Sequence, residues 1–109
     1  MSPAAVTDGD WEASVLRAPG PVLVDFWAPW CVPCRAVSAL AADLAERHAG
    51  RLTVLTVNTD DEPRLAGRYD ILSVPTLILF SGGAPVERLG GNIRAKRLDA
   101  ALAPNLDQE

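Results

Sequence analysis

The chain has 109 residues, of which 49% are hydrophobic and 22% charged, and its formal net charge at pH 7 is -4. This length suits one globular domain, and the composition is that of a folded protein rather than a disordered one. The basic residues are scattered, which argues against nucleic acid as the main partner because phosphate binding needs clustered Lys and Arg. We therefore expect a single domain over residues 1–109.

Strands that alternate with helices are predicted along the whole chain. Apolar runs rich in Val and aromatic residues indicate strands covered on both faces, and apolar residues three or four apart indicate helices. Pro63 suits a first helical turn, Gly50 suits a helix end, and Gly82–Gly83 suits a tight hairpin turn. In chain order we expect a strand at 3–6, a helix around 11–16, a strand at 21–28, a helix at 33–49, a strand at 51–58, a helix at 62–69, strands at 74–80 and 85–90, and a helix at 93–106.

This order of elements predicts an α/β fold. The expected core is a central mixed sheet of four to five strands, flanked by about four helices on its two faces. In the first helix we expect Thr7 or Asp8 as the N-cap residue and Trp11 in the core. Functional sites in such sheets gather where the carboxyl end of a strand meets a helix, and Cys31 lies at such a junction.

Both cysteines of the chain, Cys31 and Cys34, lie in the stretch FWAPWCVPCRA. A purely structural disulfide between them would close a very short loop and add roughly 2 kcal/mol to the free energy of unfolding. A domain of this size does not need that contribution. A zinc site needs three or four protein ligands. His48, the sole histidine, lies about 21 Å from Cys34 along a continuous helix, which is too far to bind the same metal ion. A metal or cluster shared between two chains stays open as an alternative.

A redox role explains more of this stretch than the two alternatives do. Cys31 precedes the predicted helix, where free N–H groups and the positive end of the helix dipole favour a thiolate. Cys34 lies one turn into the helix, where it is more covered, and a helical turn brings the two positions to about 5 Å, within disulfide reach. Cys31 is thus the expected nucleophile and Cys34 the resolving thiol, with Pro33 in the first helical turn.

Asp25 is the only charged residue in a strand that is expected to be buried on both faces. An ionised carboxylate is costly to bury unless it is paired, so we expect desolvation to raise its pKa. Because Asp25 lies on the strand that leads to Cys31, we interpret it as a proton acceptor near neutral pH. A buried acid that is hydrogen-bonded for structural reasons is the alternative.

The stretch VDFWAPWCVPC, together with VPT at residues 74–76 and a glycine after the hairpin, resembles the thioredoxin family. The resemblance extends from Val6 to Leu106 and implies the thioredoxin fold. It implies a thiol–disulfide oxidoreductase that reduces protein disulfides. In that reaction Cys31 matches an exposed nucleophile, which attacks a disulfide of a substrate protein to form a mixed disulfide, and Cys34 releases the reduced substrate.

The resemblance also implies roles for residues around the cysteines. Asp25 matches a buried acid that transfers a proton with Cys34, and Trp27 and Asp60 match a supporting pair in which the indole hydrogen-bonds the acid. Pro75 matches a cis-proline beside the active site. The surface that receives substrate proteins is expected to include Trp30, Val32, Pro33, Val74, Pro75 and Gly91, with the backbone of Val74 pairing with the substrate chain.

The implied partners are a thioredoxin reductase and disulfide-bearing proteins such as ribonucleotide reductase, peroxiredoxin and methionine sulfoxide reductase. The family holds no cofactor or metal beyond its redox-active disulfide, whereas the reductase uses FAD and NADPH. No basic leader with an apolar run opens the chain, and no run is long enough to span a bilayer, so we expect a cytoplasmic protein. The composition is rich in Arg and Ala with one Lys, which indicates a bacterial source, and we expect a monomer. The alternatives are a specialised oxidant or isomerase, or a partner-binding module with incidental redox activity.

Three residues depart from the family pattern. Ala39 replaces a proline that often kinks the active-site helix, so we expect a straighter helix unless packing bends it. Val32 lies between the cysteines where glycine is usual, so its β-branched side chain leaves the reduction potential and the choice of partner open. Thr56 stands where many members have a lysine close to the buried acid. Without that cation, we expect a more strongly raised pKa for Asp25.

Overall fold

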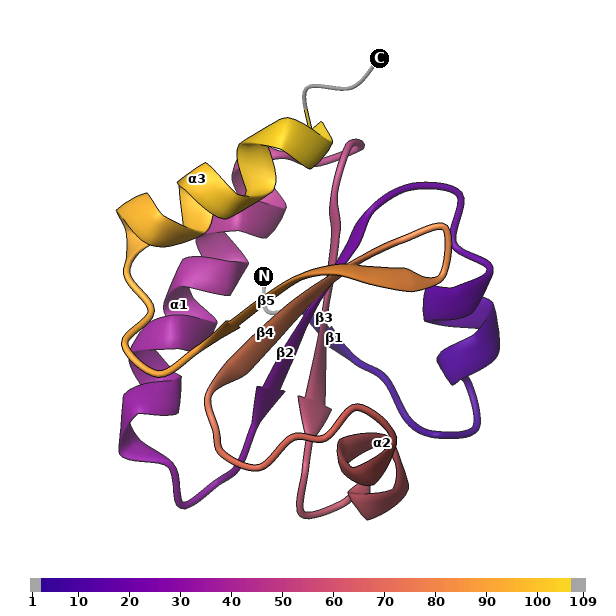
Figure 1. Cartoon of the computed structure of the whole chain (residues 1–109), viewed down its shortest axis with the longest axis vertical. Helices are drawn as coiled ribbons and strands as arrows, with labels where there is room; N and C mark the ends of the chain where they lie inside the picture. The colour runs from indigo at the N-terminus through magenta and orange to yellow at the C-terminus, as the bar shows by residue number, and fades with distance from the viewer. Residues whose placement is uncertain (1–2, 107–109) are drawn as a thin grey trace.

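The computed structural model describes residues 3–106 as a five-stranded mixed sheet with helices on both faces (Figure 1). The predicted α/β architecture is confirmed, and the ends of the helices and strands lie close to the predicted ones. In chain order the elements are β1 (Ala4–Ala5), the π-helix η1 (Glu12–Leu16), β2 (Val22–Trp27), α1 (Val32–Arg47), β3 (Thr53–Asn58), α2 (Pro63–Arg68), β4 (Thr76–Ser81), β5 (Ala84–Gly90) and α3 (Ala95–Leu106).

Strand β2 is the middle strand of the sheet, whose order is β1-β3-β2-β4-β5. It pairs in parallel with β3, where Asp25 lies opposite Thr56, and antiparallel with β4, where Asp25 lies opposite Leu77. Strands β4 and β5 form the expected antiparallel hairpin. Because both edges of β2 are occupied, Asp25 lies at the centre of the sheet.

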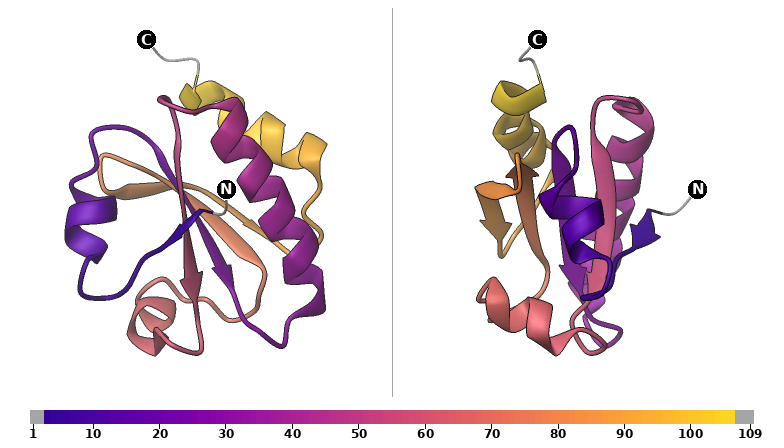
Figure 2. Two further views of the ribbon diagram at one scale, coloured as in Figure 1. Left: turned by 180° about the vertical axis from the view of Figure 1, so that it is seen from behind. Right: turned by 90° about the vertical axis from the view of Figure 1, so that its right-hand side faces the viewer.

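Side chains of β2 alternate between two hydrophobic layers, as the period of a strand requires. Leu23 packs in the layer that includes Leu98 and Leu102 of α3, whereas Val24 and Phe26 pack in the layer under η1 and α2. Figures 1 and 2 show α1 and α3 together on one side of the sheet and η1 and α2 on the other. The same alternation turns Asp25 toward α1.

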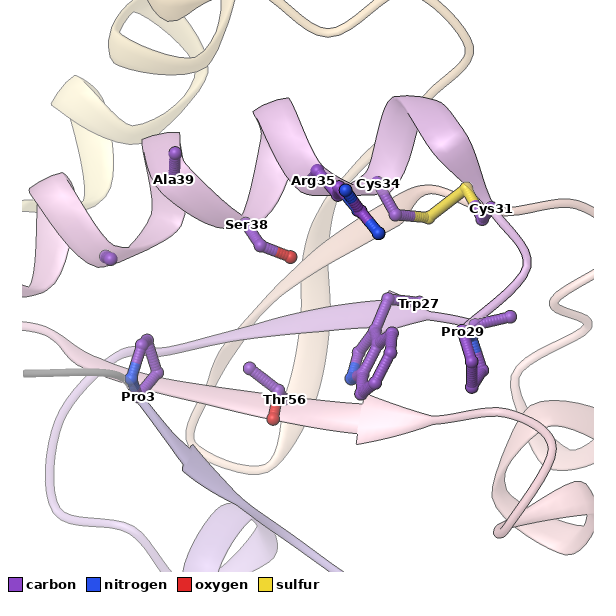
Figure 3. A pocket seen from close by; sticks show the side chains of 11 residues that line it. Pro3, Trp27, Pro29, Cys31, Cys34, Arg35, Ser38, Ala39 and Thr56 are labelled. Atoms are coloured by element: carbon purple, nitrogen blue, oxygen red, sulfur yellow. A yellow bond between two sulfur atoms is a disulfide. The ribbon is translucent and has the colours of Figure 1, made fainter.

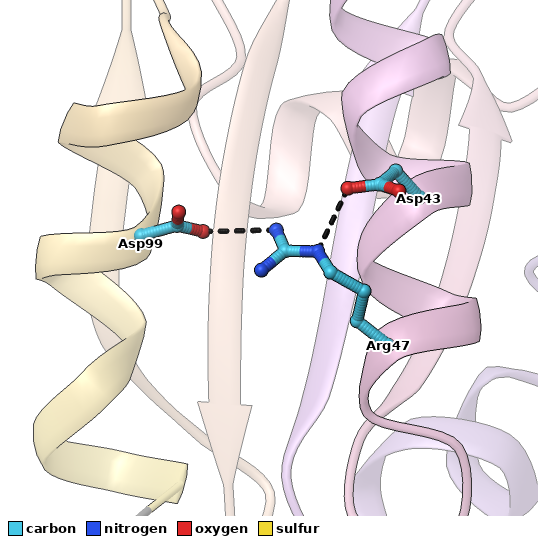
Figure 4. Close-up of polar contacts among 3 residues, drawn as sticks. All are labelled: Asp43, Arg47 and Asp99. Carbon is cyan, nitrogen blue, oxygen red and sulfur yellow. Dashed lines mark hydrogen bonds and ion pairs between the residues drawn. The ribbon is translucent and has the colours of Figure 1, made fainter.

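An arginine joins the two helices that cover this face. Arg47 of α1 contacts the carboxylate of Asp43 on its own helix at 2.8 Å and that of Asp99 on α3 at 3.1 Å (Figure 4). All three side chains are about half exposed, and such surface pairs contribute about 0–1 kcal/mol each. The buried leucines that α3 packs against the sheet therefore supply most of its attachment.

The N-cap prediction for the first helix is wrong. Helix η1 begins after Trp11, and neither Thr7 nor Asp8 caps it. Instead, the backbone N–H and the hydroxyl of Thr7 both donate to the carboxylate of Asp10, at 2.6 and 2.9 Å. Thr7 lies four residues before the N-cap position at Trp11, so its hydrogen bonds close a turn ahead of the helix and do not reach the N–H groups of its first turn.

Trp11 lies in the core, as predicted. Its indole N–H donates to the hydroxyl of Tyr69 at 3.0 Å, and its ring contacts those of Tyr69, Phe26 and Phe80. Tyr69 directly follows α2, so this cluster attaches α2 to the sheet. It also fixes the start of the segment that runs from Tyr69 to Pro75.

The hairpin turn gives a test of the backbone geometry. Gly82 and Gly83 both have positive φ, +60° and +83°, as a two-residue turn of this kind requires. A Cβ on Gly83 would lie 2.7 Å from the carbonyl oxygen of Leu16, whereas a Cβ on Gly82 would meet nothing within 4 Å. Gly82→Ala is expected to cost about 1–2 kcal/mol of unfolding free energy for its left-handed conformation, and Gly83→Ala roughly 1 kcal/mol more because it also clashes.

Urea unfolding of the two variants measures this difference, with Gly82→Ala as the matched control. Equal losses of stability would show that the close approach to Leu16 does not constrain the turn.

Candidate active site

Cys31 and Cys34 form a disulfide where β2 leads into α1. Cys31 is the N-cap residue of α1, Cys34 lies in its first turn, and their Cα atoms are 5.4 Å apart. The N–H of Cys34 donates to the carbonyl of Cys31 at 3.3 Å. Pro33 lies in the first turn, where its missing N–H removes no helical hydrogen bond. The expectation that a helical turn brings the two cysteines within disulfide reach is confirmed.

Both cysteines are covered in this oxidised form, which corrects the expectation of an exposed Cys31. Cys31 exposes 6% of its surface and Cys34 2%, so the expected order of burial holds but the difference is small. The cause is packing, because both cysteines belong to a small apolar cluster with Ala28, Trp27 and Val74. The exposed side chains are their neighbours in sequence, Trp30 at 69% and Val32 at 80%.

The segment before β4 closes the site on another side. The peptide bond between Val74 and Pro75 is cis, as the resemblance implied, and Val74 packs against the disulfide cluster. Thr76 pairs with Gly90, the residue before Gly91, so Gly91 lies near the same end of the sheet. Gly91 is exposed and has a positive φ of +73°. The cis-proline segment and Gly91 thus come together from distant parts of the chain.

The predicted supporting pair of Trp27 and Asp60 is wrong. Asp60 accepts a hydrogen bond from the indole N–H of Trp30, at 3.3 Å, and not from Trp27. Trp27 is the last residue of β2, and its carbonyl accepts from the backbone N–H and the hydroxyl of Thr59. Its side chain lies beneath the disulfide (Figure 3). Trp30 follows the strand end, so its indole reaches Asp60 while its ring stays exposed.

The carboxylate of Asp25 is fully buried. Its Oδ2 accepts a hydrogen bond from the hydroxyl of Ser38 at 2.8 Å, whereas its Oδ1 has no hydrogen-bond partner among residues 3–106. Burial raises the pKa of Asp25 from 3.8 to about 6, and the hydrogen bond from Ser38 offsets only part of this effect. The raised pKa predicted for this acid is confirmed.

A pocket of about 640 Å³ lies behind the disulfide, between α1 and the sheet (Figure 3). Its polar walls are the hydroxyl residues Ser38 and Thr56, and Arg35 lies at its side. The remaining lining residues are Pro3, Trp27, Ala28, Pro29, Cys31, Cys34, Ala39 and Ala42. Within the described part of the chain, no group of three or more His, Cys, Asp or Glu side chains could hold a metal ion.

Ser38 is the site residue that sequence reasoning missed. It lies one helical turn after Cys34, and residues four apart share a face of a helix, so its spacing from Cys34 was the available signal. That signal is weak, because a serine within a helix is common on solvent-facing sides as well.

Comparison with known proteins places these features in a family, since the family model described as Thioredoxin matches residues 2–104. The chain belongs to the thioredoxin family. It is 44% identical to Thioredoxin 1 of Nostoc sp. over 107 residues, which cover 97% of this chain and 100% of the relative. It is 43% identical to a thioredoxin of Alicyclobacillus acidocaldarius over 98 residues, 90% of this chain and 92% of the relative.

A third relative, Thioredoxin M2, chloroplastic, of Arabidopsis thaliana, is 40% identical over 97 residues, 89% of this chain and 52% of the relative. Thioredoxins are thiol–disulfide oxidoreductases. Family membership and the Cys31–Cys34 disulfide together establish this activity for the chain. The chain lacks the glycine that is usual between the cysteines of this family, since Val32 occupies that position.

The buried acid leads to a prediction about stability and pH. Between pH 3.8 and about 6 the folded protein binds the proton of Asp25 more tightly than the unfolded chain does, so its stability falls as pH rises through this window. At pH 7 the ionisation of Asp25 lowers the free energy of unfolding by on the order of 3 kcal/mol, compared with the protein whose Asp25 is protonated. Asp25→Asn is therefore expected to stabilise the oxidised protein at pH 7 by about 2–3 kcal/mol.

Unfolding in urea at several pH values measures this effect, with Asp61→Asn as the control because Asp61 is exposed. The slope between pH 4 and 6 should be smaller in Asp25→Asn than in Asp61→Asn. An unchanged slope in Asp25→Asn would show that the acid ionises at an ordinary pH.

Proposed function

We propose that this thioredoxin reduces disulfides of other proteins, with Cys31 as nucleophile, Cys34 as resolving thiol and Asp25 as proton acceptor. The observation that carries the proposal is the Cys31–Cys34 disulfide at the amino end of α1, together with a buried acid on β2, the strand that leads into it. The exposed side chains Trp30 and Val32 on either side of Cys31 supply a surface for a partner protein.

The first step uses the reduced dithiol. The position of Cys31 at the start of α1, at the positive end of the helix dipole, favours the thiolate. This thiolate attacks one sulfur of a partner's disulfide. A bond forms between Cys31 Sγ and that sulfur, the partner's S–S bond breaks, and its second sulfur leaves as a thiolate that takes a proton from water.

The second step releases the partner. Cys34 is covered by the cluster around it, so its thiol needs a nearby base to give up its proton. The ionised Asp25 accepts that proton, and the Cys34 thiolate attacks Cys31 Sγ. The mixed disulfide breaks, the partner's sulfur leaves as a thiolate that takes a proton from water, and the Cys31–Cys34 disulfide forms. The partner leaves with both sulfurs reduced, having gained the two electrons that this protein has lost.

Partner proteins are proposed to dock on the surface around the cysteines. Trp30 and Val32 offer apolar area there, and the hydrogen bond from Trp30 to Asp60 limits how freely the indole moves. The backbone of Val74, before the cis-proline, is proposed to pair with an extended segment of the partner, as strand addition does in other complexes. Pro33, Pro75 and Gly91 complete this proposed surface.

The oxidised protein needs a source of two electrons after each turnover. We propose a thioredoxin reductase that uses FAD and NADPH as that source, with no cofactor held by this chain. Proposed substrates are proteins with disulfide chemistry, such as ribonucleotide reductase, peroxiredoxin and methionine sulfoxide reductase.

We also propose that the protein acts as a monomer in the cytoplasm of a bacterium, because a reductase of this kind needs a reducing compartment. Among residues 3–106, no helix is long and apolar enough to cross a membrane.

Two cysteine variants test the assigned order of attack. Cys31→Ser is expected to lose insulin-disulfide reduction in the presence of NADPH and a thioredoxin reductase, down to the rate without protein. Cys34→Ser is expected to attack but not release, so it should accumulate a mixed disulfide with its partner that reductant dissolves. Activity that survives in Cys31→Ser would refute the nucleophile assignment and would favour a binding module with incidental redox chemistry.

Val32 favours a second candidate, a relative that oxidises or isomerises disulfides, because residues between the cysteines influence the potential. Equilibration of the protein with reduced and oxidised glutathione separates the two functions. We expect a potential more reducing than a glutathione pool of roughly -220 to -260 mV. A potential near that of disulfide isomerases, roughly -180 mV, would replace the reductase with the second candidate.

A further inference from the structure

Ser38 connects the helix of the resolving cysteine to the strand of the buried acid. Ser38 and Cys34 are four residues apart in α1, and both side chains point from the helix toward the sheet (Figure 3). Both line the pocket behind the disulfide. The hydroxyl of Ser38 donates to Oδ2 of Asp25 at 2.8 Å, so the acid is attached to the same helix face that carries Cys34.

Among residues 3–106, no charged side chain donates a hydrogen bond to the carboxylate of Asp25. In the sheet, Asp25 lies opposite the uncharged Thr56 on β3 and opposite Leu77 on β4. From α1, the polar or titratable side chains on this face are Cys34 and Ser38, while Arg35 beside the pocket is solvent-exposed and has no hydrogen bond to Asp25. The bond from Ser38 is the sole hydrogen bond to this carboxylate within residues 3–106.

We propose that Ser38 is a positioning residue for proton transfer at Cys34, holding Oδ2 of Asp25 so that Oδ1 is the oxygen that exchanges the proton. This inference rests on the proposed role of Asp25 as proton acceptor. A carboxylate with one oxygen hydrogen-bonded cannot rotate freely about its Cβ–Cγ bond, so the free oxygen keeps one direction. In the resolving step the proton of Cys34 passes to Oδ1, and the Cys34 thiolate then breaks the mixed disulfide.

The hydroxyl has a second effect on the same step. A donor to a carboxylate stabilises its ionised form, and only the ionised form of Asp25 can accept a proton. Burial acts in the opposite direction and is the larger effect on the pKa of Asp25. Ser38 therefore keeps a larger fraction of the acid ionised near neutral pH than burial alone would allow.

The test is Ser38→Ala, which removes one hydroxyl and introduces a better helix former, so the variant should fold. Its matched control is Thr56→Val, because Thr56 lines the same pocket without a hydrogen bond to Asp25. Two quantities are measured in each variant. The first is the pKa of Asp25 from the NMR titration of its carboxyl carbon, and the second is the pH dependence of release from the mixed disulfide in single turnover.

Loss of the Ser38 hydroxyl is expected to shift the pKa of Asp25 upward by up to about one unit, which lowers the ionised fraction up to tenfold at pH values below the pKa. Release should slow several-fold near pH 6 and recover at higher pH, whereas Thr56→Val should follow the wild-type curve. Ser38→Thr retains a hydroxyl and should restore the wild-type profile.

A wild-type titration and release profile in Ser38→Ala would overturn the positioning role, as would a profile in Ser38→Thr that matches that of Ser38→Ala. Either result would leave the proposed reductase function intact. That function would be refuted by a different result, namely disulfide reduction that persists in Cys31→Ser. A loss of stability without a shift in the pH profile would also count against positioning, since it would indicate a purely structural hydroxyl.

Discussion

Burial of residues 22–26 of the middle strand β2 is the constraint on which the rest of the site depends. Neighbouring strands occupy both of its edges, and hydrophobic layers cover both of its faces. The alternation of the strand turns Asp25 toward α1, and the end of the strand at Trp27 places Cys31 at the start of that helix. One strand thus determines both the position of the disulfide and the low polarity around the acid.

Two opposed effects act on that acid, and their sizes decide its chemistry. Burial disfavours the carboxylate, while the single hydrogen bond from Ser38 favours it, and burial is the larger of the two. A pKa near 6 follows, so Asp25 can both accept and return a proton close to neutral pH. The same imbalance makes the folded protein less stable when the acid ionises, so chemistry at this position opposes stability.

The covered cysteine Cys31 and the exposed side chains of the proposed docking surface are direct neighbours along the chain. The sulfur of Cys31 is covered by its apolar cluster, whereas Trp30 and Val32 on either side of it are exposed. In the proposed docking mode, a partner contacts these exposed side chains beside the covered sulfur. The hydrogen bond from Trp30 to Asp60 restricts the indole, and in the proposed docking this restriction lowers the entropy lost on binding.

The sequence by itself determined the features that depend on local geometry. Apolar periodicity predicted the strands and helices, and the spacing of Cys31 and Cys34 predicted a disulfide because a helical turn sets that distance. The raised pKa of Asp25 also followed from its place in an apolar strand, and the cis bond at Pro75 came from the family resemblance. Only the tertiary structure decided which indole reaches Asp60 and which hydroxyl reaches Asp25, because those contacts join segments far apart in sequence, and the packing of helices and loops on the sheet sets their distances.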